Sequence, residues 1–104
     1  MMRTYKVIIT ESAKEQLKEY IAYIMREFQN KQAAQALRDD ARETKKRLEI
    51  CAGSLRPLQN PGLNGYRKMH FLKHDFVMLY RIEGNGVYVD RIYHELQDYE
   101  NKFE

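Results

Sequence analysis

The chain of 104 residues lacks the features that several classes of protein require. Cys51 is its only cysteine, which excludes an intrachain disulfide framework and a zinc site built from cysteines. No apolar run approaches the ~18 to 20 residues that a membrane-spanning helix needs. The N-terminal stretch MMRTYKVIIT has neither a long apolar segment nor a small-residue cleavage site, so no signal peptide is expected. Together these absences favour a cytoplasmic protein with no membrane partner.

The composition that remains is that of one globular domain, expected to span residues 1–104. Hydrophobic residues make up 43% and charged residues 32%, which argues against a disordered chain. The charges are unevenly placed: residues 45–73 hold seven Lys or Arg and one acid, whereas residues 74–104 hold three Lys or Arg and seven acids. This pattern predicts a surface that faces a polyanion, and a solvated surface without a partner is the alternative.

The spacing of apolar residues predicts a strand, two helices and three further strands. Residues 4–10 alternate as a strand does, and the stripe in ESAKEQLKEYIAYIMREFQ follows as a helix, capped by Thr10 or Ser12. A second helical stripe covers residues 33–51, and the proline- and glycine-containing residues 52–64 predict a loop. Strands are expected at residues 66–72, 76–82 and 87–94, with a hairpin turn at EGNG because Asn85-Gly86 tolerates positive φ.

This order of elements predicts an α+β fold, with an N-terminal strand, a helical hairpin and a three-stranded antiparallel meander. The two helical stripes would pack on one face of the sheet. The opposite face would stay uncovered, and its side chains could point into a cleft. The polar tail is expected to pack through Tyr99 and Phe103.

The stretch GYRKMHFLKHDFVMLYRI at residues 65–82 carries groups suited to phosphate chemistry. Strand alternation places Lys68 and His70 on the outer side with Tyr66, whereas Arg67 shares the core side and would emerge only at the strand end. Histidine transfers protons near neutral pH, and arginine and lysine bind phosphate. Cleavage of RNA by its own 2′-hydroxyl needs both kinds of group and no metal. These residues therefore suggest a metal-free ribonuclease site, in which imidazoles and cations converge over the open face of the sheet.

Each candidate also has a purely structural explanation. His94 could serve only to end the last strand, and His70 could be an ordinary exposed histidine. Arg81 could pair with Glu83 or Asp90. The last strand has no cleanly apolar face, so its orientation stays open.

The remaining candidates lie on the second helix and in the strand turn. Lys45, Lys46 and Arg47 could contact RNA or form a solvated helix face. Asp75 could bind substrate or stabilise the turn. His74 follows His70 by four residues, a spacing that chelates metal from a helix but not from a strand and turn. No metal is expected, because the two histidines and Asp75 form no recognised ligand set. No cofactor is expected, because the chain has no glycine-rich phosphate loop.

Three stretches carry a resemblance to a known family, in this order along the chain: YKVIITESAKEQLKEYIAYI, GYRKMHFLKHDFVMLYRI and GVYVDRIYHELQDY. Through them the chain resembles the RelE/ParE family of bacterial type II toxins over nearly its whole length. The resemblance implies the fold predicted above and a cognate antitoxin that holds the toxin inactive. It implies one of two activities. RelE-like members cleave mRNA in the ribosomal A site without metal, whereas ParE-like members inhibit DNA gyrase and have no nuclease site.

The family's functional residues carry over only in part. His94 matches a catalytic histidine near the end of the last strand. His70 and Asp75 resemble a histidine and aspartate of YafQ-like nucleases, with a spacing one residue longer. Leu72 stands where RelE has a catalytic arginine, and Glu95 stands where YoeB-like members have a tyrosine.

From these patterns we predict a toxin that is a ribosome-dependent mRNA endonuclease. Its predicted partners are the antitoxin, the ribosome and mRNA. His94 and His70 would transfer protons. The predicted phosphate and RNA contacts are Arg67, Arg81, Lys68, Asp75, Lys45, Lys46 and Arg47. The alternatives are a gyrase inhibitor, or a degenerate toxin that only binds its antitoxin.

Overall fold

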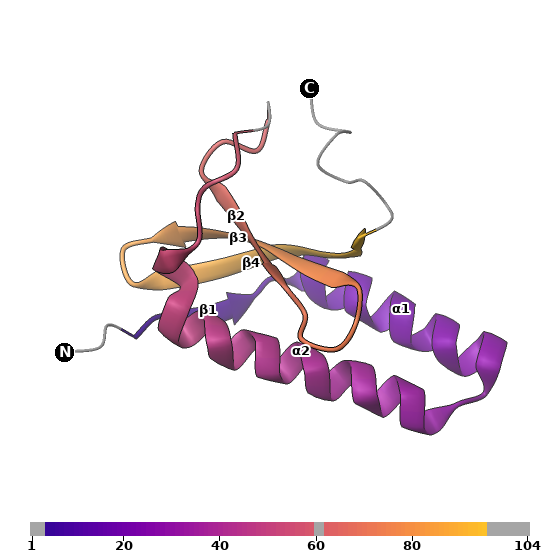
Figure 1. The fold of residues 1–104 in the computed structure, drawn as a ribbon. Coiled ribbons are helices and arrows are strands. Elements are labelled where there is room, and N and C mark those ends of the chain that lie inside the picture. The colour runs from indigo at the N-terminus through magenta and orange to yellow at the C-terminus, as the bar shows by residue number, and fades with distance from the viewer. Residues whose placement is uncertain (1–3, 60–61, 96–104) are drawn as a thin grey trace.

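A computed structural model describes residues 4–59 and 62–95 of the chain. Over these residues it has four strands, two α-helices and a short 3₁₀ helix (Figure 1). In chain order they are β1 (Lys6–Ile9), α1 (Glu11–Phe28), α2 (Lys31–Cys51), η1 (Ala52–Ser54), β2 (Tyr66–His70), β3 (Phe76–Glu83) and β4 (Gly86–His94). The expected packing of Tyr99 and Phe103 lies outside the described residues. Neither α-helix in the described ranges is long and apolar enough to cross a membrane.

The four strands form one sheet in the order β1-β4-β3-β2. The meander β2-β3-β4 is antiparallel, as predicted, and β1 joins the far edge of β4 in parallel. The helical hairpin of α1 and α2 packs on one face of this sheet (Figure 1). The predicted α+β class is therefore confirmed.

Local side chains set where the helices begin and end. Thr10 caps α1 because its hydroxyl accepts a hydrogen bond from the backbone N–H of Ala13. Gln29 ends α1 in the left-handed region, at φ 46°. The side chain of Asn30 then caps α2, so the second helix starts at Lys31, two residues before the predicted position.

The core lies between the helical hairpin and the sheet. Leu37 and Leu48 of α2 are fully buried there, against strand residues such as Met78. Burying a leucine side chain contributes about 1.5–3 kcal/mol. Tyr80 is also fully buried, and its hydroxyl donates a 2.7 Å hydrogen bond to the carbonyl of Ala52. Burial raises the pKa of Tyr80 from 10.0 to about 12.

The sheet face opposite the helices, called the open face below, is only partly open. Leu63, buried in the loop before β2, packs on Val77, Leu79 and Tyr93, with Leu58 beside them. This second apolar cluster contradicts the expectation that the whole face is uncovered. The reason is that β3 is apolar on both faces, so the loop must cover the outer one.

A β-bulge in β4 explains why neither side of its sequence looked apolar. Leu79 of β3 pairs with Arg91, but the next residue, Tyr80, pairs with Val89, so Asp90 is the extra residue. After the bulge, each residue of β4 points to the face opposite to the one that simple alternation from Val89 would give it. Val89 before it and Ile92 after it both join the helix-facing core.

The end of β4 runs past the end of β1 and is paired by helix side chains instead. The backbone N–H of Ile92 donates to the side-chain oxygen of Gln16 at 2.7 Å, and that of His94 donates to the Tyr20 hydroxyl at 3.2 Å. Gln16 and Tyr20 are one helical turn apart, so their spacing matches alternate residues of a strand. Helix α1 thereby covers a strand edge that would otherwise be unpaired.

Two turns differ in detail from the prediction. The hairpin between β3 and β4 is present, but its positive φ of 61° falls at Gly84 and not in Asn85-Gly86. Strand β2 ends at His70, two residues early, because the backbone N–H of Leu72 turns toward α2.

Candidate functional site

Directly paired strand residues share a face, so the register gives the layout of the open face. Three rows cross it from β2 over β3 to β4: Tyr66, Arg81 and Tyr88; Lys68, Leu79 and Arg91; His70, Val77 and Tyr93. Of the predicted site residues, the sheet therefore brings Lys68, His70 and Arg81 together on this face.

His94 lies on the other face of the sheet. It pairs with Phe76, and the two rings meet edge to face at 5.1 Å between centroids. Phe76 belongs to the helix-facing core, whereas His70 pairs with Val77 of the open face. The expectation that both histidines converge over one open face is wrong, because the bulge at Asp90 reverses the end of β4. The catalytic roles of the two histidines stay predictions.

Arg67 braces the backbone on the core side of β2. Its Nη1 donates to the carbonyl of Gly53 at 3.0 Å and to that of Leu55 at 2.7 Å. These bonds tie β2 to the segment that follows α2. Of the two neighbouring cations, Lys68 is the one on the open face.

Arg81 is engaged by two carboxylates. Its Nε donates to Asp90 at 2.9 Å and its Nη1 donates to Glu83 at 2.6 Å, so both of the pairings considered from the sequence occur. The guanidinium also lies 4.7 Å from the centroid of the Tyr88 ring. The hydrogen bond to Asp90 raises the pKa of Arg81, so the guanidinium stays protonated. The carboxylates of Asp90 and Glu83 balance its positive charge.

Tyr66 completes this cluster. Its hydroxyl donates to the same Asp90 oxygen at 2.8 Å. Burial, followed by the hydrogen bond to Asp90, raises the pKa of Tyr66, so the phenol is neutral at physiological pH.

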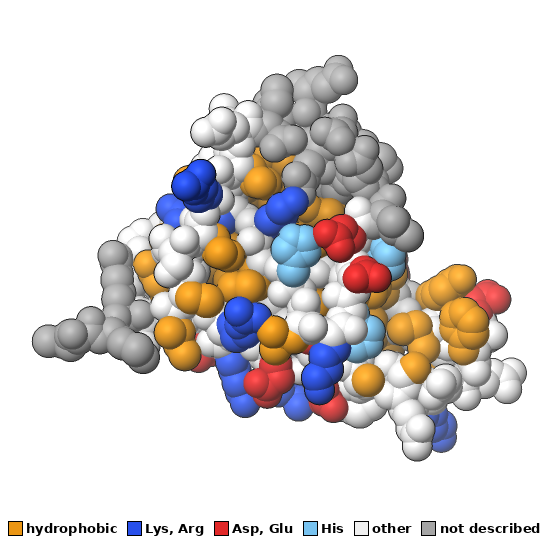
Figure 2. Space-filling model, viewed as in Figure 1, with side chains coloured by type: hydrophobic (Ala, Val, Ile, Leu, Met, Phe, Trp, Pro, Cys, Tyr) orange, Lys and Arg blue, Asp and Glu red, His pale blue; other side chains and the backbone are white. Residues whose placement is uncertain are grey.

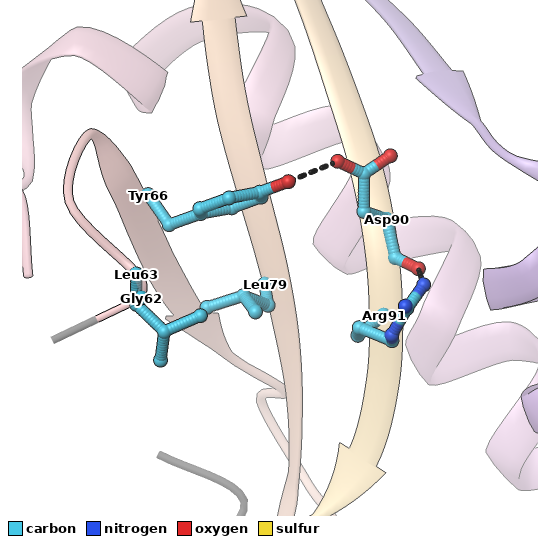
Figure 3. Close-up of a pocket in the computed structure, with 6 residues that line it drawn as sticks. All are labelled: Gly62, Leu63, Tyr66, Leu79, Asp90 and Arg91. Carbon is cyan, nitrogen blue, oxygen red and sulfur yellow. Dashed lines mark hydrogen bonds between the residues drawn. The ribbon is translucent and has the colours of Figure 1, made fainter. Parts of the chain in front are cut away.

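A hollow of about 240 Å³ opens beside this cluster (Figure 3). It is lined by Gly62, Leu63, Tyr66, Leu79, Asp90 and Arg91. Figure 3 shows Tyr66 reaching across to Asp90 on β4, with Leu79 and Leu63 along the apolar side. Nη1 of Arg91 donates to the backbone carbonyl of Asp90 at 2.8 Å.

His70 has one ionic contact on the open face. Its Nδ1 lies 3.4 Å from the Glu95 carboxylate, and both side chains are about half exposed. Exposed pairs of this kind contribute about 0–1 kcal/mol. The imidazole of His70 stays half exposed beside this carboxylate.

Asp40, a buried acid with several hydrogen bonds, was not predicted from the sequence as a site residue. The side chain of Asp40 on α2 is only 1% exposed and lies 2.6 Å from Nδ1 of His74. Burial alone would raise the pKa of Asp40, but hydrogen bonds from His74 and from the backbone of Lys73 and Leu72 outweigh it and lower the pKa. The sequence did contain a sign of this role, because Asp40 lies on the apolar stripe of the second helix, between Leu37 and Thr44.

The three consecutive cations of α2 do not form one surface. Lys45, Lys46 and Arg47 are consecutive helix residues and project in different directions, and Lys46 lies 3.5 Å from Glu43. Figure 2 shows Lys and Arg side chains interspersed with Asp and Glu over the visible face. The prediction that these three cations contact RNA is untested.

Asp75 lies exposed in the β2–β3 turn, where its carbonyl accepts a 2.8 Å hydrogen bond from the N–H of Glu95. Its backbone therefore supports the turn, and the predicted role of its side chain in binding substrate is untested. Across residues 4–59 and 62–95, no group of three or more His, Cys, Asp or Glu side chains could hold a metal ion.

Two solved structures share the overall fold, a helical hairpin on one face of a four-stranded sheet. One is the chromosomal ParDE toxin-antitoxin system from P. aeruginosa, with a TM-score of 0.72, 21% identity, and 88% of this chain and 97% of that chain covered. The other is the toxin-antitoxin complex RelBE2 from Mycobacterium tuberculosis, with a TM-score of 0.61, 20% identity, and 88% and 98% covered.

The sequence comparison is more specific than the fold. Residues 7–99 match the family described as the ParE toxin of the type II toxin-antitoxin system, parDE. The chain belongs to this family and is a type II toxin. The search of curated proteins gives no match.

Proposed function

We propose that this toxin acts in the cytoplasm by binding a protein target, DNA gyrase, and that a cognate antitoxin holds it inactive. Membership in the ParE family supports the gyrase branch of the resemblance. The two solved structures named above come from toxin-antitoxin systems, which supports an antitoxin partner. We choose gyrase inhibition over mRNA cleavage because of two observations on the sheet. The two histidines lie on opposite faces, and the guanidinium groups of Arg67 and Arg81 are already bound within the protein.

Cleavage of RNA without a metal requires two proton-transfer groups and cations gathered around one phosphate. Here His70 and His94 belong to opposite faces of the sheet. The guanidinium of Arg67 is bound to two backbone carbonyls, and that of Arg81 to two carboxylates. A phosphate at Arg81 would meet Asp90 and Glu83 as competing anions. This arrangement favours a surface for binding protein over a nuclease site.

The mRNA endonuclease predicted from the sequence is the second candidate. Lys68 and His70 share the open face, and Glu95 lies against His70. A carboxylate beside an imidazole can orient it for proton transfer. In this reading His70 would be the principal acid–base group, and the contribution of His94 would require access from the other face.

The experiment compares both activities with one preparation of purified toxin. In one reaction gyrase supercoils relaxed plasmid with increasing toxin, and in the other a message is translated in a cell-free system and mapped by primer extension. We expect supercoiling to fall, the message to stay intact and the antitoxin to restore supercoiling. His70→Ala should inhibit gyrase as the unmodified toxin does. Cleavage at ribosome-occupied codons with unchanged supercoiling would replace the proposal by the endonuclease. Harmless expression without antitoxin would indicate a degenerate toxin.

A further inference from the structure

The turn between β2 and β3, residues 71–75, is fastened to α2 by a single buried carboxylate. Asp40 accepts hydrogen bonds from the backbone N–H of Leu72 at 3.0 Å and of Lys73 at 2.8 Å, and Nδ1 of His74 lies 2.6 Å away. Figure 1 shows this turn reaching the middle of α2. Three consecutive turn residues are thus held by one side chain.

Two further bonds hold the ends of the turn. The N–H of Phe71 donates to the carbonyl of Phe76 at 2.9 Å, which closes the hairpin. The carbonyl of Asp75 accepts from Glu95, just after β4. The backbone of the turn is therefore fixed from α2, from β3 and from the end of β4.

The turn has more hydrogen bonds than a β-hairpin needs to form. Short turns join antiparallel strands without help from a distant helix. Burying a carboxylate carries a desolvation penalty that several hydrogen bonds must offset, and in this protein those hydrogen bonds fix the backbone of the turn. The enforced conformation here determines where Leu72 and Lys73 point.

Both of these side chains face water. The side chain of Leu72 is 51% exposed. Lys73 is exposed, and within the described ranges its ammonium has no ion pair or hydrogen bond. An exposed leucine alone carries little information. An exposed leucine beside an unpaired cation, on a backbone fixed by a buried charge, is a preorganised contact element, and preorganisation lowers the ordering cost of binding.

We propose that the β2–β3 turn is the element through which the toxin binds its protein target, an inference that rests on the proposed function. Leu72 inserts into an apolar pocket of the target, and Lys73 pairs with a carboxylate at the rim of that pocket. The hydrogen bonds of Asp40 hold the turn in the binding geometry before the target arrives.

The first test replaces Leu72 by serine and uses Ile50→Ser as the matched control. Ile50 is 56% exposed on α2 and lies outside the turn, so both variants remove a similar exposed apolar side chain. We expect Leu72→Ser to inhibit supercoiling about tenfold less well, because truncating a central anchor typically has an effect of this size. Ile50→Ser should inhibit as the unmodified toxin does. Equal inhibition by both variants would overturn the proposal.

The second test concerns the charge. Lys73→Glu should lose inhibition by about the same factor and Lys73→Arg should keep most of it, since only the former reverses the sign opposite a carboxylate. Antitoxin binding is measured on every variant. Retained antitoxin binding shows that the fold is intact. Weakened antitoxin binding with full growth arrest would assign the turn to the antitoxin and overturn the proposal.

Growth arrest in cells separates failure of this inference from failure of the proposed function. If the unmodified toxin leaves supercoiling unchanged, gyrase is the wrong target. The turn is then tested by growth alone: loss of arrest in Leu72→Ser, with arrest kept in Ile50→Ser, would still support a contact element for another protein target. Arrest kept by both variants would refute it.

Discussion

Replacing Asp40 by alanine should strongly destabilise the toxin, because its buried carboxylate holds the β2–β3 turn. The substitution leaves the N–H groups of Leu72 and Lys73 and the His74 ring without their acceptor in a partly buried setting. Each lost bond of this kind costs about 1–3 kcal/mol, although a relaxed turn recovers some of it with water. Breaking a buried pair by removing one partner costs about 3–5 kcal/mol, and we expect a value in this range.

The measurement is urea unfolding followed by circular dichroism. A loss of about 3–5 kcal/mol is a large part of the 5–15 kcal/mol that stabilises a typical domain, so the midpoint should fall steeply. Asp39→Ala is the matched control, because Asp39 is the neighbouring acid on α2 and its side chain is 56% exposed. It should change stability by no more than about 0.5 kcal/mol. A loss below about 1 kcal/mol for Asp40→Ala would refute the reasoning.

The same carboxylate gives a pH dependence of known sign. Because the folded-state pKa of Asp40 lies below 3.8, its bonds contribute fully above the unfolded pKa and are lost as the pH falls through the folded pKa. The unmodified toxin should therefore lose more stability than Asp40→Asn when acidified from pH 6 toward pH 3, as followed by urea midpoints.

Three further substitutions test the packing around the sheet. Gly53→Ala should destabilise by no more than about 1 kcal/mol in a thermal melt, because its new methyl group would meet only the hydroxyl at the far end of the half-buried Tyr5 side chain, which can shift. Tyr80→Phe should cost about 1–2 kcal/mol in urea unfolding by removing a buried hydrogen bond. In an alkaline absorbance titration the phenol of Tyr80 should ionise near its pKa of about 12. Gln16→Leu should cost about 1–3 kcal/mol by leaving the N–H of Ile92 unpaired and should speed its amide exchange.

Most of the fold was predictable because local patterns specify it. The apolar stripes of α1 and α2 and the alternation of β2 and β3 depend on neighbours a few residues apart. Thr10 and Asn30 mark the helix starts through contacts only three residues long.

The layout of the candidate site was less predictable because it depends on pairing between distant segments. One extra residue at Asp90 reverses the end of β4 and moves His94 to the helix side. The local spacing showed only that neither face of this strand was cleanly apolar, which does not locate the bulge. The bonds from Asp40 to the β2–β3 turn span more than thirty residues. The pairing of Arg81 with Asp90 and Glu83 was foreseeable because all three lie on one hairpin.

The most direct test of the account is the supercoiling assay with purified toxin, gyrase and antitoxin, run beside cell-free translation of a mapped message. The account predicts that the toxin inhibits supercoiling, that the antitoxin restores it, and that the message stays whole. A cleaved message with supercoiling unchanged would contradict it.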